Sequence, residues 1–262
     1  MIIGCRNTVI PNDIDTISYC AFAFNSALDS IIIPESVTYI DYGAFMACDG
    51  LKSVSIPSSV SFVGTNAFRG CQLESINVDE GNKVYDSRNN CNAIIDTKLN
   101  KLLVGCKNTV IPQDVQTIAS GSFENIIDLE STTIPKSVTT IDEGAFAGCI
   151  NLMSVKMPNT LDFANIAPYA FGYCYNINSI VITDAKSKDE KDFKSNGISE
   201  NNNSDSISLP ELTVTSRRTD TEQLSRFARI FGESIDIILY VPKALLSDYE
   251  MFNGEFLDIK PY

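Results

Sequence analysis

Residues 28–48, LDSIIIPESVTYIDYGAFMAC, contain three phrases that recur along the chain and decide its fold. The first phrase is Leu28 to Pro34, the second is Val37 to Ile40, and the third is Gly43 to Cys48. The same phrases return in residues 51–71, 129–149 and 152–174, with a period of 23 to 25 residues. Self-similarity at this period predicts a stack of short structural repeats.

A longer repeat lies on top of the short one. Residues 4–11 match residues 105–112 at an offset of 101, and this register holds without a gap through Pro57 and Pro158. The chain therefore contains a duplicated 101-residue module, with an insertion at about residues 79–107. Within the insertion, apolar residues 93–95 and 102–104 flank a polar turn, which predicts a hairpin that leaves the stack.

Each phrase has a physical role in a stacked coil. In the first phrase, the alternating apolar residues before Pro34 are typical of a strand with one buried face, which the proline ends. Val37 and Ile40 bound a second short extended piece. The phrase around Ala44 and Phe45 predicts a tight helical or 3₁₀ turn that buries one aromatic ring per coil.

These phrases resemble the BspA-type leucine-rich repeat family of bacterial cell-surface proteins. The resemblance covers residues 4–182 and resumes at residues 239–242. It implies an α/β leucine-rich-repeat fold, a right-handed curved solenoid of mostly short strands with short helical or 3₁₀ turns. It also implies export to the outside or the surface of a bacterium, and non-enzymatic roles that include adhesion.

Three regions are predicted from these patterns. Residues 1–182 form the solenoid, residues 183–206 a flexible insertion, and residues 207–262 a capping coil of the same solenoid. The insertion is rich in Ser, Asn, Asp, Glu and Lys, and cannot bury enough apolar surface to offset the cost of ordering. In the cap, residues 224–231 have helical spacing and residues 237–241 indicate a buried strand.

The composition excludes several classes of partner. The formal net charge is −13, which disfavours nucleic acid and anionic lipid surfaces, and no apolar run is long enough to cross a bilayer. Residues 1–5 lack the features of a signal peptide, so we expect the chain to be part of a longer exported protein.

The residue types argue against catalysis and against a metal or cofactor site. The chain has no histidine, and its eight cysteines include no Cys-x-x-Cys pair. Four cysteines share one repeat position behind the Ala-Phe pair, where a small buried apolar residue is expected: Cys48, Cys71, Cys149 and Cys174. Asp41 and Asp142 recur with the repeat, which indicates turn capping.

The candidate contact residues are those that strand alternation places outward. One row comes from the first strand of successive coils: Ile32, Ser55, Asn77, Thr133, Lys156 and Val181. Tyr39 and Phe62 occupy one outward position of the second strand, where the duplicate module has Thr140. These two aromatics either contact a partner or pack on each other or under the hairpin.

The leading hypothesis is a monomeric, surface-attached or secreted binding module whose solenoid face engages a protein or a glycan. The alternative is a passive spacer that holds other domains away from the cell. A contiguous aromatic or apolar patch would favour binding, and an evenly charged surface would favour the spacer. An enzyme would require a pocket of converging polar residues with perturbed pKa values.

Limited proteolysis of the native chain is expected to cut first within residues 184–206. Deleting this segment is expected to leave the fold intact, because loop length enters the closure entropy only logarithmically. Mass spectrometry of the first fragments and a thermal melt of the deletion variant test both statements. A first cut within residues 28–174 would contradict them.

Overall fold

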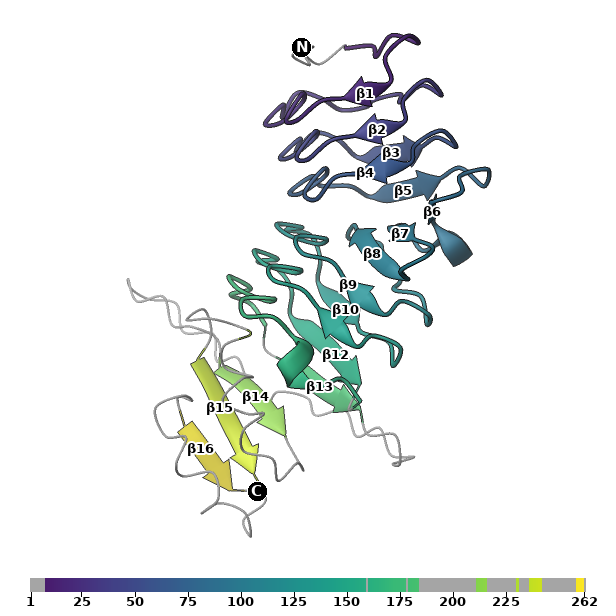
Figure 1. The fold of residues 1–262 in the computed structure, drawn as a ribbon. Coiled ribbons are helices and arrows are strands. Elements are labelled where there is room, and N and C mark those ends of the chain that lie inside the picture. Colours follow the sequence, from purple (N-terminus) through teal and green to yellow (C-terminus); the bar gives the residue numbers. More distant parts are fainter. Residues whose placement is uncertain are drawn as a thin grey trace.

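The computed structural model of the chain is a solenoid whose coils stack along one axis (Figure 1). It describes residues 8–158, 160–177 and 179–183, and then residues 211–215, 230, 236–241 and 258–261. The stacked coils, built mostly of short strands, confirm the repeat fold that the sequence predicts. Of the predicted flexible segment 183–206, Thr183 is the last residue of a strand, and residues 184–206 lie outside the described residues.

The Ile-Pro phrase forms a first ladder of parallel strands. Buried and exposed residues alternate along it, so that Val54 and Ile56 are buried while Ser53 and Ser55 are exposed. The ladder does not end at residue 183, because three further strands add to it in parallel, of which β14 is not predicted from the sequence. Its strands form two separate sheets. The first contains β3 (Ser53–Ile56) and β5 (Ser75–Val78), and the second contains β10 (Ser131–Thr133), β12 (Ser154–Pro158), β13 (Ser179–Thr183), β14 (Glu211–Thr215), β15 (Asp236–Val241) and β16 (Asp258–Pro261).

The second phrase forms a ladder of two-residue strands. In each strand the second residue is buried, as Ile40 is in β2, while the first lies outward or at the edge of the core. A bridge between Ile141 and Ile166 extends the ladder after the 3₁₀ helix η2 (Phe163–Asn165). The strands are β1 (Thr16–Ile17), β2 (Tyr39–Ile40) and β4 (Phe62–Val63), and then β9 (Thr117–Ile118) and β11 (Thr140–Ile141).

The Ala-Phe phrase forms consecutive tight turns in place of a 3₁₀ helix. The amide of Met46 donates to the carbonyl of Gly43 at 3.0 Å within the coil, whereas the amide of Phe45 donates to the carbonyl of Ala67 in the next coil at 2.8 Å. Gly43 (φ 61°) and Ala47 (φ 56°) both have left-handed backbone, as do the corresponding residues of the other coils. Amides that bond within the coil alternate with amides that bond to the next coil, so every second amide is available for pairing between coils. Glycine adopts the left-handed backbone at the least cost.

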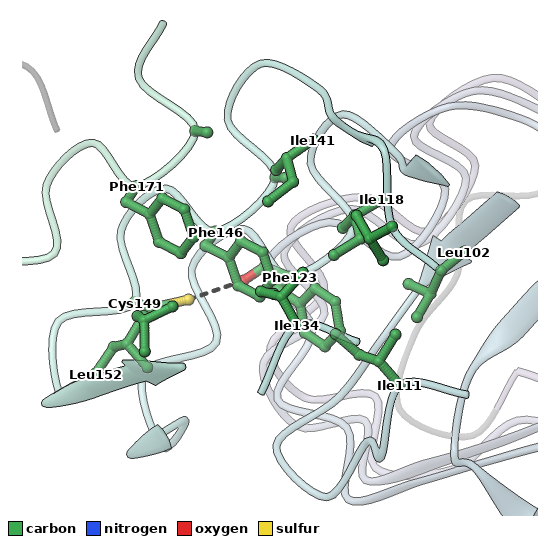
Figure 2. Packing of buried hydrophobic residues seen from close by; sticks show 14 of the residues in the cluster. Leu102, Ile111, Ile118, Phe123, Ile134, Ile141, Phe146, Cys149, Leu152 and Phe171 are labelled. Atoms are coloured by element: carbon green, nitrogen blue, oxygen red, sulfur yellow. Dashed lines mark hydrogen bonds between the residues drawn. The ribbon is translucent and has the colours of Figure 1, made fainter. Parts of the chain in front are cut away.

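Two columns of stacked phenylalanines fill the interior. Each ring lies 4.7 to 5.1 Å from the next: Phe22, Phe45 and Phe68 in the first module, and Phe123, Phe146 and Phe171 in the second. Figure 2 shows the second column with the aliphatic residues around it. The Cys149 thiol donates to the carbonyl of Phe123 at 3.1 Å, and the thiols of Cys48, Cys71 and Cys174 make the same bond to Phe22, Phe45 and Phe146.

The insertion lies within the stack, and the expectation that its hairpin leaves the stack is wrong. Its antiparallel strands are β6 (Tyr85–Asp86), β7 (Ile94–Asp96) and β8 (Lys101–Val104), with the 3₁₀ helix η1 (Arg88–Asn90) after β6. β8 pairs in parallel with β9, so it takes the place of a second-ladder strand. Ile94 and Val104 pack against the first module, whereas Ile95 and Leu102 pack against the second. The hairpin has two buried faces and therefore separates two cores.

Asn82 and Tyr85 lead the chain into the insertion. The buried Asn82 amide donates to the carbonyls of Pro57 and Val60, both at 2.9 Å, and its carbonyl oxygen accepts from the amides of Val84 and Tyr85. The Tyr85 hydroxyl accepts from the amide of Val63 at 3.0 Å, which ends the first three-stranded ladder. Buried polar groups are thereby satisfied where the regular ladder stops.

Ion pairs join the insertion and the first module to the second module. Lys101 binds Asp142 at 2.8 Å, Lys107 binds Glu74 at 2.9 Å, and Arg69 pairs with Glu124. Burial raises the pKa of Glu124, while Arg69 acts in the opposite direction. Ion pairs that solvent still reaches contribute on the order of 1 kcal/mol each, so these pairs orient the junction more than they stabilise it.

At the junction, Gly105 lies against the ring of Phe123. A Cβ atom at Gly105 would stand 2.2 Å from Cε1 of that ring, and the Gly105 amide donates to the carbonyl of Ser122 at 2.8 Å. The peptide of Gly105 therefore covers the first ring of the second column, and any side chain there would displace the ring.

Gly105→Ala is expected to lower the free energy of unfolding by about 1 to 3 kcal/mol, the usual cost of overpacking a filled core. In a Phe123→Leu background the same substitution should cost at least about 1 kcal/mol less, because the obstructing ring is gone. The difference is measured by urea unfolding of the wild type, the two single variants and the double variant. Equal costs in both backgrounds would show that the ring is not the obstacle.

Candidate functional site

The outward row of the first ladder is divided by the insertion into two parts. Ser55 pairs with Asn77, and Thr133 pairs with Lys156, which pairs with Val181. Ile32 is 83% exposed, and the side chains of Ser55, Asn77, Thr133 and Lys156 are exposed as well. The side chain of Val181 lies outside the described part of the chain. Hydroxyl, amide, ammonium and alkyl groups follow one another along this row, so it forms no uniform patch.

Tyr39 and Phe62 stack on each other and remain partly exposed. Their ring centroids are 4.2 Å apart with an interplanar angle of 11°. The ring of Tyr42 meets Phe62 edge-on at 5.9 Å. Tyr39 and Phe62 therefore pack on each other, which is one of the two alternatives, and both side chains remain partly exposed.

Two further tyrosines widen this surface. Tyr19 is 69% exposed and Tyr42 is 47% exposed, and they occupy the same repeat position in successive coils. Sequence reasoning missed them because they precede the Ala-Phe turn, whose backbone is not a strand. The sequence did contain a signal for them. Each tyrosine lies three residues after the outward position of a second-ladder strand, Tyr19 after Thr16 and Tyr42 after Tyr39. We call Tyr19, Tyr39, Tyr42 and Phe62 the aromatic cluster.

Asp41 supplies negative charge to the aromatic cluster. Its Oδ1 accepts from the amide of Tyr42 at 2.7 Å, a local bond consistent with the predicted turn role. Burial, and then the charges of Asp41 and Tyr42, raise the pKa of Tyr39. Asp41 is also among the causes that raise the pKa of Tyr19, after a hydrogen bond and charge interaction with Cys20 and burial. The carboxylate is thus close enough to act on both tyrosines.

The row of the cluster ends at a small side chain. Thr16 of β1 pairs with Tyr39, which pairs with Phe62, so the three residues follow one another in parallel register. Strands in such a ladder lie about 4.8 Å apart, which is the spacing of stacked rings. Phe62 stacks on one face of Tyr39, whereas Thr16, its partner on the other side, has no ring to stack on the opposite face.

The duplicate module lacks the three tyrosines of the cluster at the corresponding positions. Ser120 stands where the first module has Tyr19, Thr140 where it has Tyr39, and Glu143 where it has Tyr42. Asp142 corresponds to Asp41 but is paired with Lys101. The coil forms in both modules, so the solenoid does not require the aromatic cluster.

Most of the buried thiols have a raised pKa, whereas the hydrogen bond with Cys71 lowers the pKa of Cys48. A hydrogen bond with the Cys48 thiol, together with burial, raises the pKa of Cys71 well above its usual range, and burial chiefly does the same for Cys149. Burial raises the pKa of Cys91 to about 11. Protonated, enclosed thiols are poor nucleophiles and poor metal ligands. The seven cysteines within the described residues are free.

Metal and membrane sites were also sought in the structure. Over the described ranges, no group of three or more Cys, Asp or Glu residues has the arrangement needed to hold a metal ion. None of the helices in those ranges has the length and apolarity to cross a membrane.

Comparison with known proteins identifies the family. The BspA type leucine-rich repeat region matches residues 3–97 and 94–216, in six copies. The chain is a BspA-type leucine-rich repeat protein. The resemblance in the Ile-Pro and Ala-Phe-x-x-Cys phrases is thereby confirmed. A search of curated proteins gave no significant match.

Solved structures similar to this BspA-type chain come from bacteria. The pneumococcal vaccine antigen PcpA has a TM-score of 0.61 at 18% identity, over 97% of this chain and 67% of that one, which supports the fold. A leucine-rich cell surface protein of Faecalibacterium prausnitzii is 22% identical, with a TM-score of 0.43, over 68% of this chain and 60% of that one. A leucine-rich repeat protein of Eubacterium ventriosum is 23% identical, with a TM-score of 0.49, over 65% and 52%. The BspA-type chain thus spans only part of the length of these proteins.

Core and surface aromatics of this BspA-type chain should respond differently to truncation. Phe45→Ala is expected to lower the free energy of unfolding by about 3 to 5 kcal/mol, because its ring is fully buried between two others. Tyr39→Ala should lose less than half as much, since its ring is partly exposed. Urea titrations compare the two variants, and equal losses would make Tyr39 a core residue.

Proposed function

We propose that this chain is a non-enzymatic binding module of a secreted or surface-attached bacterial protein. Its contact surface is the aromatic cluster on the first module. Ile32 and Phe24 of the first module are also strongly exposed. Protein and glycan partners both use exposed aromatics of this kind.

The observation that supports this proposal is the difference between the two modules. Both build the same coil, yet exposed Tyr19 and Tyr42 occur in the first where Ser120 and Glu143 stand in the second. A single exposed aromatic residue is normal, whereas several exposed aromatics on adjacent coils favour a contact surface. The membership in a family with bacterial surface members agrees with this role.

The passive spacer is the competing function, and one variant separates the two. Tyr19→Ser combined with Tyr39→Thr places on the first module the residues that the second module already carries. The coil should therefore fold normally, which circular dichroism and a thermal melt check. The matched control is Tyr169→Gly, which removes a 49% exposed tyrosine from the second module and installs the residue found one coil earlier, at Gly144.

Binding is measured by surface plasmon resonance against purified extracellular-matrix proteins and serum glycoproteins, and on an array of defined glycans. At least one probe that binds the wild type is expected to bind the double variant about tenfold more weakly or worse, because contact aromatics dominate such interfaces. The control variant should bind that probe as the wild type does. If no probe binds, or if every bound probe binds the double variant equally, the spacer function stands.

A further inference from the structure

The first two coils are acidic. Residues 8–51 contain six carboxylates and no lysine or arginine: Asp13, Asp15, Asp29, Glu35, Asp41 and Asp49. The ion-paired cations Arg69, Arg88, Lys101 and Lys107 all lie at the insertion and the junction. The surface that carries most of the aromatic cluster is therefore strongly and locally negative.

One of these carboxylates, Asp41, lies close to Tyr39. It follows Tyr39 by two residues, its Oδ1 accepts from the amide of Tyr42, and its charge acts on the pKa of Tyr39. Asp15 is exposed directly before Thr16, in the coil that precedes the coil of Tyr39. At physiological ionic strength charges interact over about 8 Å, so Asp41 and the Tyr39 ring can act on one bound group together.

We infer that the aromatic cluster binds an arginine side chain of a basic protein segment. This inference rests on the proposed binding function and names the class of partner. The guanidinium group stacks on the face of Tyr39 that Phe62 leaves uncovered, on the side of Thr16. It also donates hydrogen bonds to the carboxylate of Asp41, which accepts from the Tyr42 amide through one oxygen and has further acceptor capacity.

The chemistry of the surface favours arginine over other ligands. A guanidinium group is planar, stacks on aromatic faces and keeps its charge at any physiological pH. Sialylated or uronic glycans and phosphorylated peptides are repelled by the six carboxylates. A neutral sugar could stack on Tyr39 but would gain nothing from the surrounding charge. Lysine would gain the charge attraction without the planar stacking.

The test uses the full chain and a fluorescein-labelled peptide of alternating arginine and glycine, nine residues long. Fluorescence polarisation is read at low and physiological salt. The matched peptide carries citrulline in place of arginine, which keeps the shape of the side chain and removes its charge. We expect the arginine peptide to bind, to weaken as salt increases, and to bind at least about tenfold more tightly than the citrulline peptide.

Two chain variants locate the site, each with a control. Tyr39→Ala and Asp41→Asn are each expected to weaken the arginine peptide about two- to tenfold. Asp49→Asn removes the same charge from the other side of the Ala-Phe turn in the same coil, and Thr140→Ala alters the position that corresponds to Tyr39 in the second module. Both controls should bind as the wild type does.

Each outcome decides the inference. Equal binding of the arginine and citrulline peptides, or equal weakening by Asp41→Asn and Asp49→Asn, overturns it. Binding of a neutral glycan that Tyr39→Ala abolishes, with no specific arginine binding, also overturns it but leaves the proposed function in place. If Tyr19→Ser with Tyr39→Thr changes the binding of no probe, the proposed function fails as well.

Discussion

Hydrogen bonds between neighbouring coils set the distance at which every side-chain column must pack. Parallel strands lie about 4.8 Å apart, and a ring stacked on a ring needs nearly the same distance. The phenylalanines therefore stack at 4.7 to 5.1 Å without displacing the backbone, and each column thiol reaches the carbonyl of the phenylalanine one coil earlier. The same spacing brings Tyr39 and Phe62 face to face on the outside. Core and contact surface follow from one geometric constraint.

The repeat made much of this structure predictable. A residue that recurs in register, such as Phe45 or Cys48, must occupy one column, so its burial could be inferred without knowledge of the turn. The hairpin could not be placed in this way. Ile94 and Ile95 occur once, and nothing local indicates that both faces of their strand are covered, one by each module. Whether a strand in a parallel stack pairs in the antiparallel direction depends on the segments that pack on either side of it. The alternation of apolar and polar residues within one strand carries no information about those segments.

The contact surface was predictable only in part for a related reason. Strand alternation placed Tyr39 and Phe62 outward, but the rings also satisfy each other, and the sequence could not show how much of each remains exposed. Tyr19 and Tyr42 lie where the chain enters the tight turns, beyond the reach of an alternation rule. Duplication supplies the missing comparison: the coils of the second module form without Tyr19, Tyr39 and Tyr42, so these tyrosines are not among the residues that a coil needs.

The bond from each column thiol to the coil before it has a mechanical consequence. A coil that peels from the end of the stack breaks this bond and uncovers that one sulfur, while the sulfurs deeper in the stack stay enclosed. The cysteines of successive coils are therefore markers at known heights along the solenoid. An alkylating reagent applied while the protein is pulled or warmed would record, residue by residue, how far the stack has unzipped and whether the two cores, separated by the hairpin, open together or in turn.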